Sequence, residues 1–139
     1  MDSFTKVIDE IILTPSDKGV IKKIYQKGEG QCPEAGQEVL VNYEGRLEDG
    51  TVFDTSQNRG EALKVMIGKG VVIKGWDIGI MSMQLGERAE LIIKSEYGYG
   101  AIGSPPSIPG NATRIFKVDL IQIGDRKPTR WMLSDMELI

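Results

Sequence analysis

The alternation of apolar and polar residues over 39–47 constrains the fold more than any other feature of this chain. The apolar face consists of Val39, Val41, Tyr43 and Leu47, and the opposite face is dominated by Asn42, Glu44 and Arg46. This period of two predicts an antiparallel strand with one buried face. The dipeptide Asp49-Gly50 follows, which is a strong hairpin signal. We therefore expect a return strand over 51–53.

The remaining elements are short and are joined by turns, as seventeen glycines and six prolines suggest. Strands are predicted over 20–25, 63–67, 88–94 and 114–123, a helix over 74–83, and loops over 28–36, 54–60 and 97–113. An antiparallel sheet must bury its apolar face against that helix, so the predicted class is α+β. Apolar residues over 8–13 fit a short helix or a strand equally well.

Composition excludes several classes of function. The net charge of −3 provides no basic field for nucleic acid or anionic lipid. No apolar run approaches the ~20 residues of a membrane span. Residues 1–6 lack the basic and then apolar plan of a signal peptide. We expect one domain in the cytoplasm or nucleus, without nucleic-acid or membrane partners.

The chain contains no histidine and a single cysteine. Ser-His-Asp triads, Cys-His dyads and His-ligated zinc are therefore excluded within it. Cys32 has no partner for an internal disulfide or a cysteine metal cluster, and we interpret it as an incidental loop thiol. No metal and no cofactor are expected.

Four short motifs have simpler interpretations than the chemistry they suggest. Residues 98–103 match G-x-G-x-x-G, but Ser104-Pro105-Pro106 prevents the helix that would present phosphate with N–H groups. Residues 70–75 resemble a P-loop without its Lys-Ser/Thr. The sequon at 111–113 is expected to be unused, since nothing suggests secretion. Asp54 and Asp77 are expected to act as caps or hydrogen-bond acceptors.

Aromatic residues on different elements could form either a plain core or a pocket, and they are Tyr43, Phe53, Trp76, Tyr97, Tyr99 and Phe116. The segment 71–76 runs β-branched residues into Gly75 and Trp76, which would make a good floor for an apolar pocket. Core packing alone remains the alternative for Trp76. Two phenols in a Gly-rich loop favour a pocket rim, because their hydroxyls need polar partners.

Five ordered blocks within 19–124 resemble the FKBP-type peptidyl-prolyl cis-trans isomerases, the immunophilins that bind tacrolimus and rapamycin. The blocks are Val39-x-Val41-x-Tyr43-x-Gly45, Gly50-x-x-Phe53-Asp54-x-Ser56, Gly68-x-Gly70-x-Val72-Ile73-x-Gly75-Trp76-Asp77, Tyr97-Gly98-Tyr99-Gly100 and Ile108-Pro109-x-Asn111-Ala112. The resemblance implies a twisted antiparallel sheet wrapped around one short helix, with a pocket between the helix and the sheet.

The resemblance also implies a pocket lining with Trp76 as the floor under a proline ring. The implied residues are Tyr43, Phe53, Asp54, Arg59, Val72, Ile73, Trp76, Tyr99, Ile108 and Phe116. Many family members carry aromatic residues where this chain has Leu63 and Val65. Single-domain members often have His and Ile where it has Ser104 and Ser107. We expect these departures to alter ligand selectivity at the rim more than activity.

The implied function is isomerisation of X–Pro bonds in polypeptides, with binding of and inhibition by tacrolimus and rapamycin. The residues expected to carry catalysis are Tyr43, Phe53, Asp54, Ile73, Trp76, Tyr99 and Phe116. A dry apolar pocket would favour the twisted, less polar amide over the planar one. The alternative is a binding module, a co-chaperone scaffold that recognises proline loops without catalysis.

The expected organisation is a lead-in over 1–18, an isomerase domain over 19–125, and a linker or helix start over 126–139. Ser134 to Glu137 has a capping-box pattern, which predicts a helix beginning near the end of the chain. Trp131-Met132-x-Ser134 resembles the linker to tetratricopeptide repeats in larger immunophilins, although a frayed C-terminus is the alternative. Those repeats bind Hsp90 in the family. No such repeat lies in this sequence, so chaperone binding by this chain itself is not expected. We expect the chain to be a monomer.

Overall fold

The computed structural model of the chain describes residues 6–98 and 111–128. Within these ranges, seven strands form one antiparallel sheet with the order β1-β2-β6-β7-β3-β4, and β5 also pairs with β3. The strands are β1 (Asp9–Ile12), β2 (Val20–Gln26), β3 (Glu38–Leu47), β4 (Val52–Thr55), β5 (Leu63–Met66), β6 (Arg88–Ile93) and β7 (Arg114–Ile123). This sheet and one short α-helix confirm the predicted α+β class.

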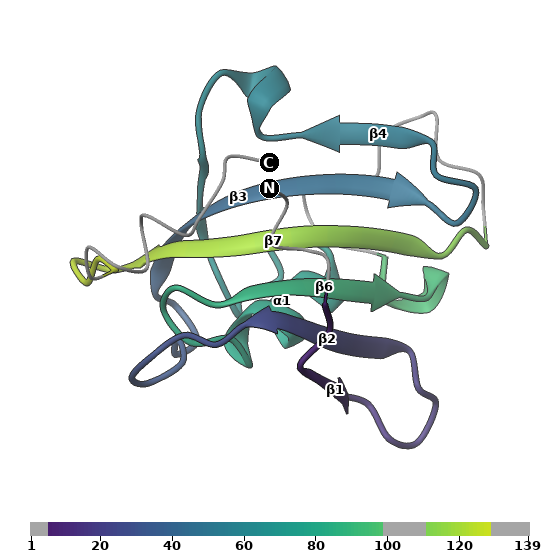
Figure 1. Cartoon of the computed structure of the whole chain (residues 1–139), viewed down its shortest axis with the longest axis horizontal. Helices are drawn as coiled ribbons and strands as arrows, with labels where there is room; N and C mark the ends of the chain where they lie inside the picture. Colours follow the sequence, from purple (N-terminus) through teal and green to yellow (C-terminus); the bar gives the residue numbers. More distant parts are fainter. Residues whose placement is uncertain (1–5, 99–110, 129–139) are drawn as a thin grey trace.

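The helix α1 (Lys74–Met81) lies behind β2 and β6 in the view of Figure 1, across one face of the sheet. Two 3-10 turns complete the described elements, η1 (Gln57–Arg59) after β4 and η2 (Ser95–Tyr97) after β6. None of the described helices is long and apolar enough to cross a membrane.

The strand β3 is as long as its interior neighbour β7, and it follows the predicted alternation except at Asn42, which is only 5% exposed although it was expected on the polar face. Val39, Val41 and Tyr43 are at most 2% exposed and face the core. On one side β3 pairs with β7 along its length. On the other side its first half pairs with β5 and its second half with β4, so residues 56–62 must leave the sheet between them. This gap at the edge of β3 is where the pocket described below opens.

The ambiguous segment near the N-terminus is a strand. β1 pairs antiparallel with β2 from Asp9↔Ile24 to Ile12↔Ile21 and forms one edge of the sheet (Figure 1). All four of its residues are exposed, so its sequence shows no alternation to distinguish a strand from a helix. The helix and the return strand also differ by a few residues from expectation, ending at Met81 and Thr55.

Two glycines allow α1 to lie close to β6. A Cβ on Gly75 would be 2.5 Å from Ile93 Cγ2, and one on Gly79 would be 2.6 Å from Leu91 Cδ1. Both partners are fully buried. Glycine weakens an isolated helix, so the helix depends on this packing for its stability. The hydrophobic core, to which the helix contributes Trp76 and Ile80, consists of Val20, Val39, Val41, Tyr43, Val65, Ile67, Val72, Trp76, Ile80, Met83, Leu85, Ala89, Leu91, Ile93, Phe116, Val118, Leu120 and Ile123.

Two buried ion pairs were not indicated by the sequence. Arg88 Nε lies 2.6 Å from Asp119 Oδ1, between neighbouring positions of β6 and β7. Lys22 Nζ lies 2.8 Å from Glu87 Oε2 and also donates to the Ser82 carbonyl just after α1. The second pair therefore ties β2 to the turn that leads from α1 into β6.

We expect Gly75→Ala to lower the free energy of unfolding by about 1–3 kcal/mol, because the new methyl group overlaps the stiff, buried Ile93 side chain. Urea unfolding measures this change. The neighbouring exposed Lys74 provides a matched control, since Lys74→Ala should change stability by no more than about 0.5 kcal/mol. Equal stability of Gly75→Ala and the wild type would contradict the close packing.

Candidate active site

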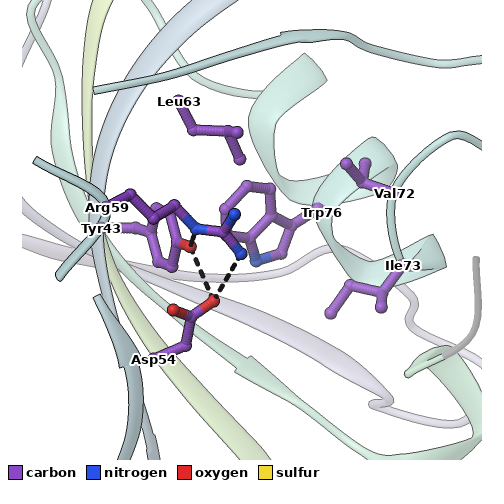
Figure 2. Close-up of a pocket in the computed structure, with 7 residues that line it drawn as sticks. All are labelled: Tyr43, Asp54, Arg59, Leu63, Val72, Ile73 and Trp76. Atoms are coloured by element: carbon purple, nitrogen blue, oxygen red, sulfur yellow. Dashed lines mark hydrogen bonds and ion pairs between the residues drawn. The ribbon is translucent and has the colours of Figure 1, made fainter. Parts of the chain in front are cut away.

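A pocket of about 110 Å³ opens between α1, the β4–β5 connection and the segment before the helix. Figure 2 shows Trp76 at its centre, with Leu63 above, a polar group on one side and the segment 72–73 on the other. The lining residues are Tyr43, Asp54, Arg59, Leu63, Val72, Ile73 and Trp76. The structure thus brings together seven of the predicted site residues.

Trp76 is both core and pocket floor. Its side chain is 4% exposed, yet it lines the pocket. The indole meets Tyr43 at 5.0 Å and Phe116 at 5.3 Å between ring centroids, both edge to face. Among the described residues its Nε1 has no hydrogen-bond partner. Core packing and a pocket floor, the two interpretations of Trp76 from the sequence, therefore do not exclude each other.

Phe53 and Phe116 support the floor from the side. Their rings meet edge to face at 5.5 Å, and Phe116 also lies 6.4 Å from Tyr43. Gly45 in β3 leaves room for both, because a Cβ there would be 2.7 Å from each ring. Contrary to the expectation, neither Phe53 nor Phe116 is among the residues that line the pocket. Phe116 contacts the rings of Trp76 and Tyr43, and Phe53 contacts Phe116 behind them.

One side of the pocket is polar. The Tyr43 hydroxyl donates to Asp54 Oδ2 at 2.7 Å and accepts from Arg59 Nε at 2.7 Å. Arg59 Nη2 donates to the same Asp54 oxygen at 3.1 Å. Burial and the adjacent Asp54 raise the pKa of Tyr43 to about 12. Tyr43 has no free proton to donate, and Asp54 Oδ1 lacks a hydrogen-bond partner among the described residues.

The segment before α1 contributes Ile73 to the pocket lining. Ile73 is the N-cap residue in extended conformation, and its carbonyl accepts from the N–H groups of Trp76 and Asp77. Within the described residues, the N–H of Ile73 itself donates no hydrogen bond. Asp77 accepts from the N–H groups of Gly68 and Gly70 at 2.7 and 2.9 Å, which fixes the loop leading to Ile73. This is the acceptor role predicted for Asp77.

Tyr97 is not among the residues that line the pocket, contrary to the expectation for its Gly-rich loop. Its hydroxyl donates to Asp17 Oδ2 at 2.5 Å, and its ring lies so close to Gly19 that no Cβ fits there. This bond lowers the pKa of Asp17 and raises that of Tyr97. Tyr97 in η2, just after β6, therefore lies beside the β1–β2 turn that contains Asp17. The sequence did not indicate this contact.

Four other predicted site residues lie outside the described ranges, and they are Tyr99, Ser104, Ser107 and Ile108. Leu63 lines the pocket as expected, whereas Val65, the second departure from the family pattern, is 6% exposed in the core. Within the described residues, no group of three His, Cys, Asp or Glu side chains could hold a metal ion.

Residues 29–121 match the sequence profile of the FKBP-type peptidyl-prolyl cis-trans isomerases. The chain belongs to this family. It is 49% identical over 110 residues to FK506-binding protein 1A of Aspergillus fumigatus, which covers 78% of this chain and 98% of that protein. It is 48% identical over 106 residues to FK506-binding protein 1 of Yarrowia lipolytica, covering 76% and 98%.

A longer relative matches equally well. The human peptidyl-prolyl cis-trans isomerase FKBP4 is 48% identical over 107 residues, which are 76% of this chain and 23% of that protein. The matched part of this FKBP chain thus spans almost all of the two fungal relatives but about a quarter of the human one.

We expect Tyr43→Phe to remove a stabilising contribution that depends on pH. The phenol titrates near 10 when unfolded and at about 12 when folded, so the folded state holds this proton more tightly. The hydroxyl's contribution is then complete below about pH 10 and is lost as the pH rises towards about 12. Urea unfolding of both proteins at several pH values measures it. A difference between them that stays constant up to pH ~12 would contradict this assignment.

Proposed function

We propose that this FKBP chain accelerates cis–trans rotation about X–Pro bonds by holding the twisted amide in the pocket over Trp76. The observation that carries the proposal is the apolar floor with its unused backbone donor at Ile73. The proposed isomerase domain is 19–125, with a lead-in over 1–18 and a linker over 126–139. We place it in the cytoplasm as a monomer whose substrates are proline-containing polypeptides.

The mechanism requires no covalent bond to the protein. Amide resonance creates a barrier of ~18–20 kcal/mol. Twisting the amide removes that resonance and makes the carbonyl less polar, so a dry pocket stabilises the twisted state relative to the planar one. An acceleration of ~10⁶ corresponds to ~8 kcal/mol of differential binding. Shape and the exclusion of water would supply most of it.

Each lining group has a proposed role. Trp76 and Val72 contact the pyrrolidine ring, Phe116 holds the indole edge to face, and Phe53 supports Phe116. The Ile73 N–H donates to a substrate carbonyl, and Tyr99 is proposed to bind another. Asp54 keeps Tyr43 and Arg59 in place with one oxygen and offers the other to a ligand donor.

The same pocket is proposed to bind FK506 (tacrolimus) and rapamycin, which would inhibit the enzyme by competition. The names of the two fungal relatives support this proposal. Leu63 occupies the wall opposite Val72, and Ser104, Ser107 and Ile108 are proposed to contact the drug at the rim. A coupled isomerisation assay with and without rapamycin tests it. Drug binding by a protein without activity would support a binding module instead.

We expect Trp76→Leu to lower both kcat/KM and the affinity for rapamycin by at least about tenfold, a loss of ~1.4 kcal/mol in each case. Leucine removes the flat ring and its two edge-to-face contacts. Trp76→Phe is the matched control: it keeps a ring and deletes only an N–H without a hydrogen bond, so it should retain more of both. A Trp76→Leu variant that folds and retains both properties would overturn the role of the floor.

We also expect kcat/KM to change by less than about twofold between pH 6 and 8, because the proposed mechanism includes no proton transfer. The chain contains no histidine, and the pKa of Tyr43 is about 12. The pH profile of the isomerisation rate measures this. A steep change in that interval would require a general acid or base and would contradict the mechanism.

A further inference from the structure

A second hollow of about 480 Å³ opens beside the proline pocket. We call it the flanking hollow, and it is lined by Leu40, Arg59, Glu61, Ala62, Leu63 and Lys64. Arg59 and Leu63 also line the proline pocket. The two cavities are therefore neighbours on either side of one wall, at the gap where β3 changes partners from β5 to β4.

A polypeptide that places its proline over Trp76 must continue past the rim. Neighbouring residues of an extended chain are ~3.3–3.6 Å apart, so a residue within two positions of the proline reaches the shared wall. The flanking hollow is then available to the side chain of that residue, whereas a free proline-sized ligand would not use it.

The walls of the flanking hollow suit a long side chain with a charged end. Leu40, Ala62 and Leu63 offer apolar surface, and Glu61 offers a carboxylate. Lysine and arginine match both parts of this lining, because each has an apolar stem and a charged head group that stays near water. An acidic or short polar side chain would use only part of this lining.

The charges in the flanking hollow favour a cation. Arg59 is held by Asp54 and Tyr43, and Lys64 lies 3.7 Å from Glu38. Glu61 is exposed, and among the described residues it has no ion pair or hydrogen bond. Both cations of the hollow thus have acidic partners, whereas its one carboxylate has none.

We propose that the flanking hollow is a specificity subsite for a lysine or arginine within two residues of the substrate proline, and that Glu61 pairs with its charge. This inference rests on the proposed isomerase function. Exposed ion pairs contribute modestly, so the expected preference for Lys over Glu at that position is about two- to fivefold in kcat/KM. Added salt should reduce it.

The test compares proline peptides that carry Lys, Gln or Glu at each of the two positions before the proline and each of the two positions after it. At one of these positions and at low salt, the kcat/KM of the wild type should be about two- to fivefold higher for the Lys peptide than for the Glu peptide. Glu61→Gln should abolish the preference, and Glu61→Lys should reverse it. Glu48→Gln, at an exposed site in the β3–β4 turn, is the matched control and should keep it.

The Gln peptides separate the two levels of the proposal. If the wild type turns over the Gln peptides but shows the same Lys-to-Glu ratio as Glu61→Gln at every position, the subsite is overturned and the isomerase function stands. If the wild type turns over none of the peptides above the uncatalysed rate, the proposed function fails and the subsite with it.

Discussion

The close approach of α1 to β6 is the constraint on which the pocket depends. Gly75 and Gly79 remove the two side chains that would hold the helix away from Ile93 and Leu91. Because the helix starts at Lys74, this contact also sets the height of Trp76 above the sheet. A helix of eight residues with two glycines would not be stable alone, so the sheet determines where the pocket floor lies.

The polar side of the pocket is built to hold charge without exchanging protons. Tyr43 is inserted between a carboxylate and a guanidinium, and its hydroxyl uses its donor and an acceptor position within this group. The raised pKa of Tyr43 keeps the phenol neutral across the ordinary pH range. Such a group can orient a ligand by fixed dipoles, and this suits a reaction in which no covalent bond is made or broken.

Much of the fold could be predicted from the sequence because its interior strands have one buried face. The alternation over 39–47 matches β3, and Asp49-Gly50 matches the turn into β4. The edge strand β1 could not be assigned, since both of its faces are exposed. The buried Lys22–Glu87 pair was also missed, because a lysine in an alternating segment is normally assigned to the solvent face.

The site was predictable in its residues and less so in its contacts. The resemblance named six of the seven lining residues, and the seventh, Leu63, was a departure from the family pattern. It did not indicate the bonds among Tyr43, Asp54 and Arg59. Those bonds depend on strand pairing that aligns Gly45 with Asp54. Similarly, the bond between Tyr97 and Asp17 joins positions 80 residues apart. A local sequence pattern cannot indicate a contact between two residues so far apart in the chain.

The position of β2 gives the chain a folding boundary that differs from the boundary of its family match. The match begins at residue 29, yet β2 lies between β1 and β6 in the sheet. A chain trimmed to the match would leave the backbone of β6 unpaired along one side, with Leu91 and Ile93 beside a bare edge. Open edges of this kind recruit strands from other molecules. The segment before residue 29 therefore belongs to the folded sheet, because β2 pairs with β6 and β1 in turn pairs with β2.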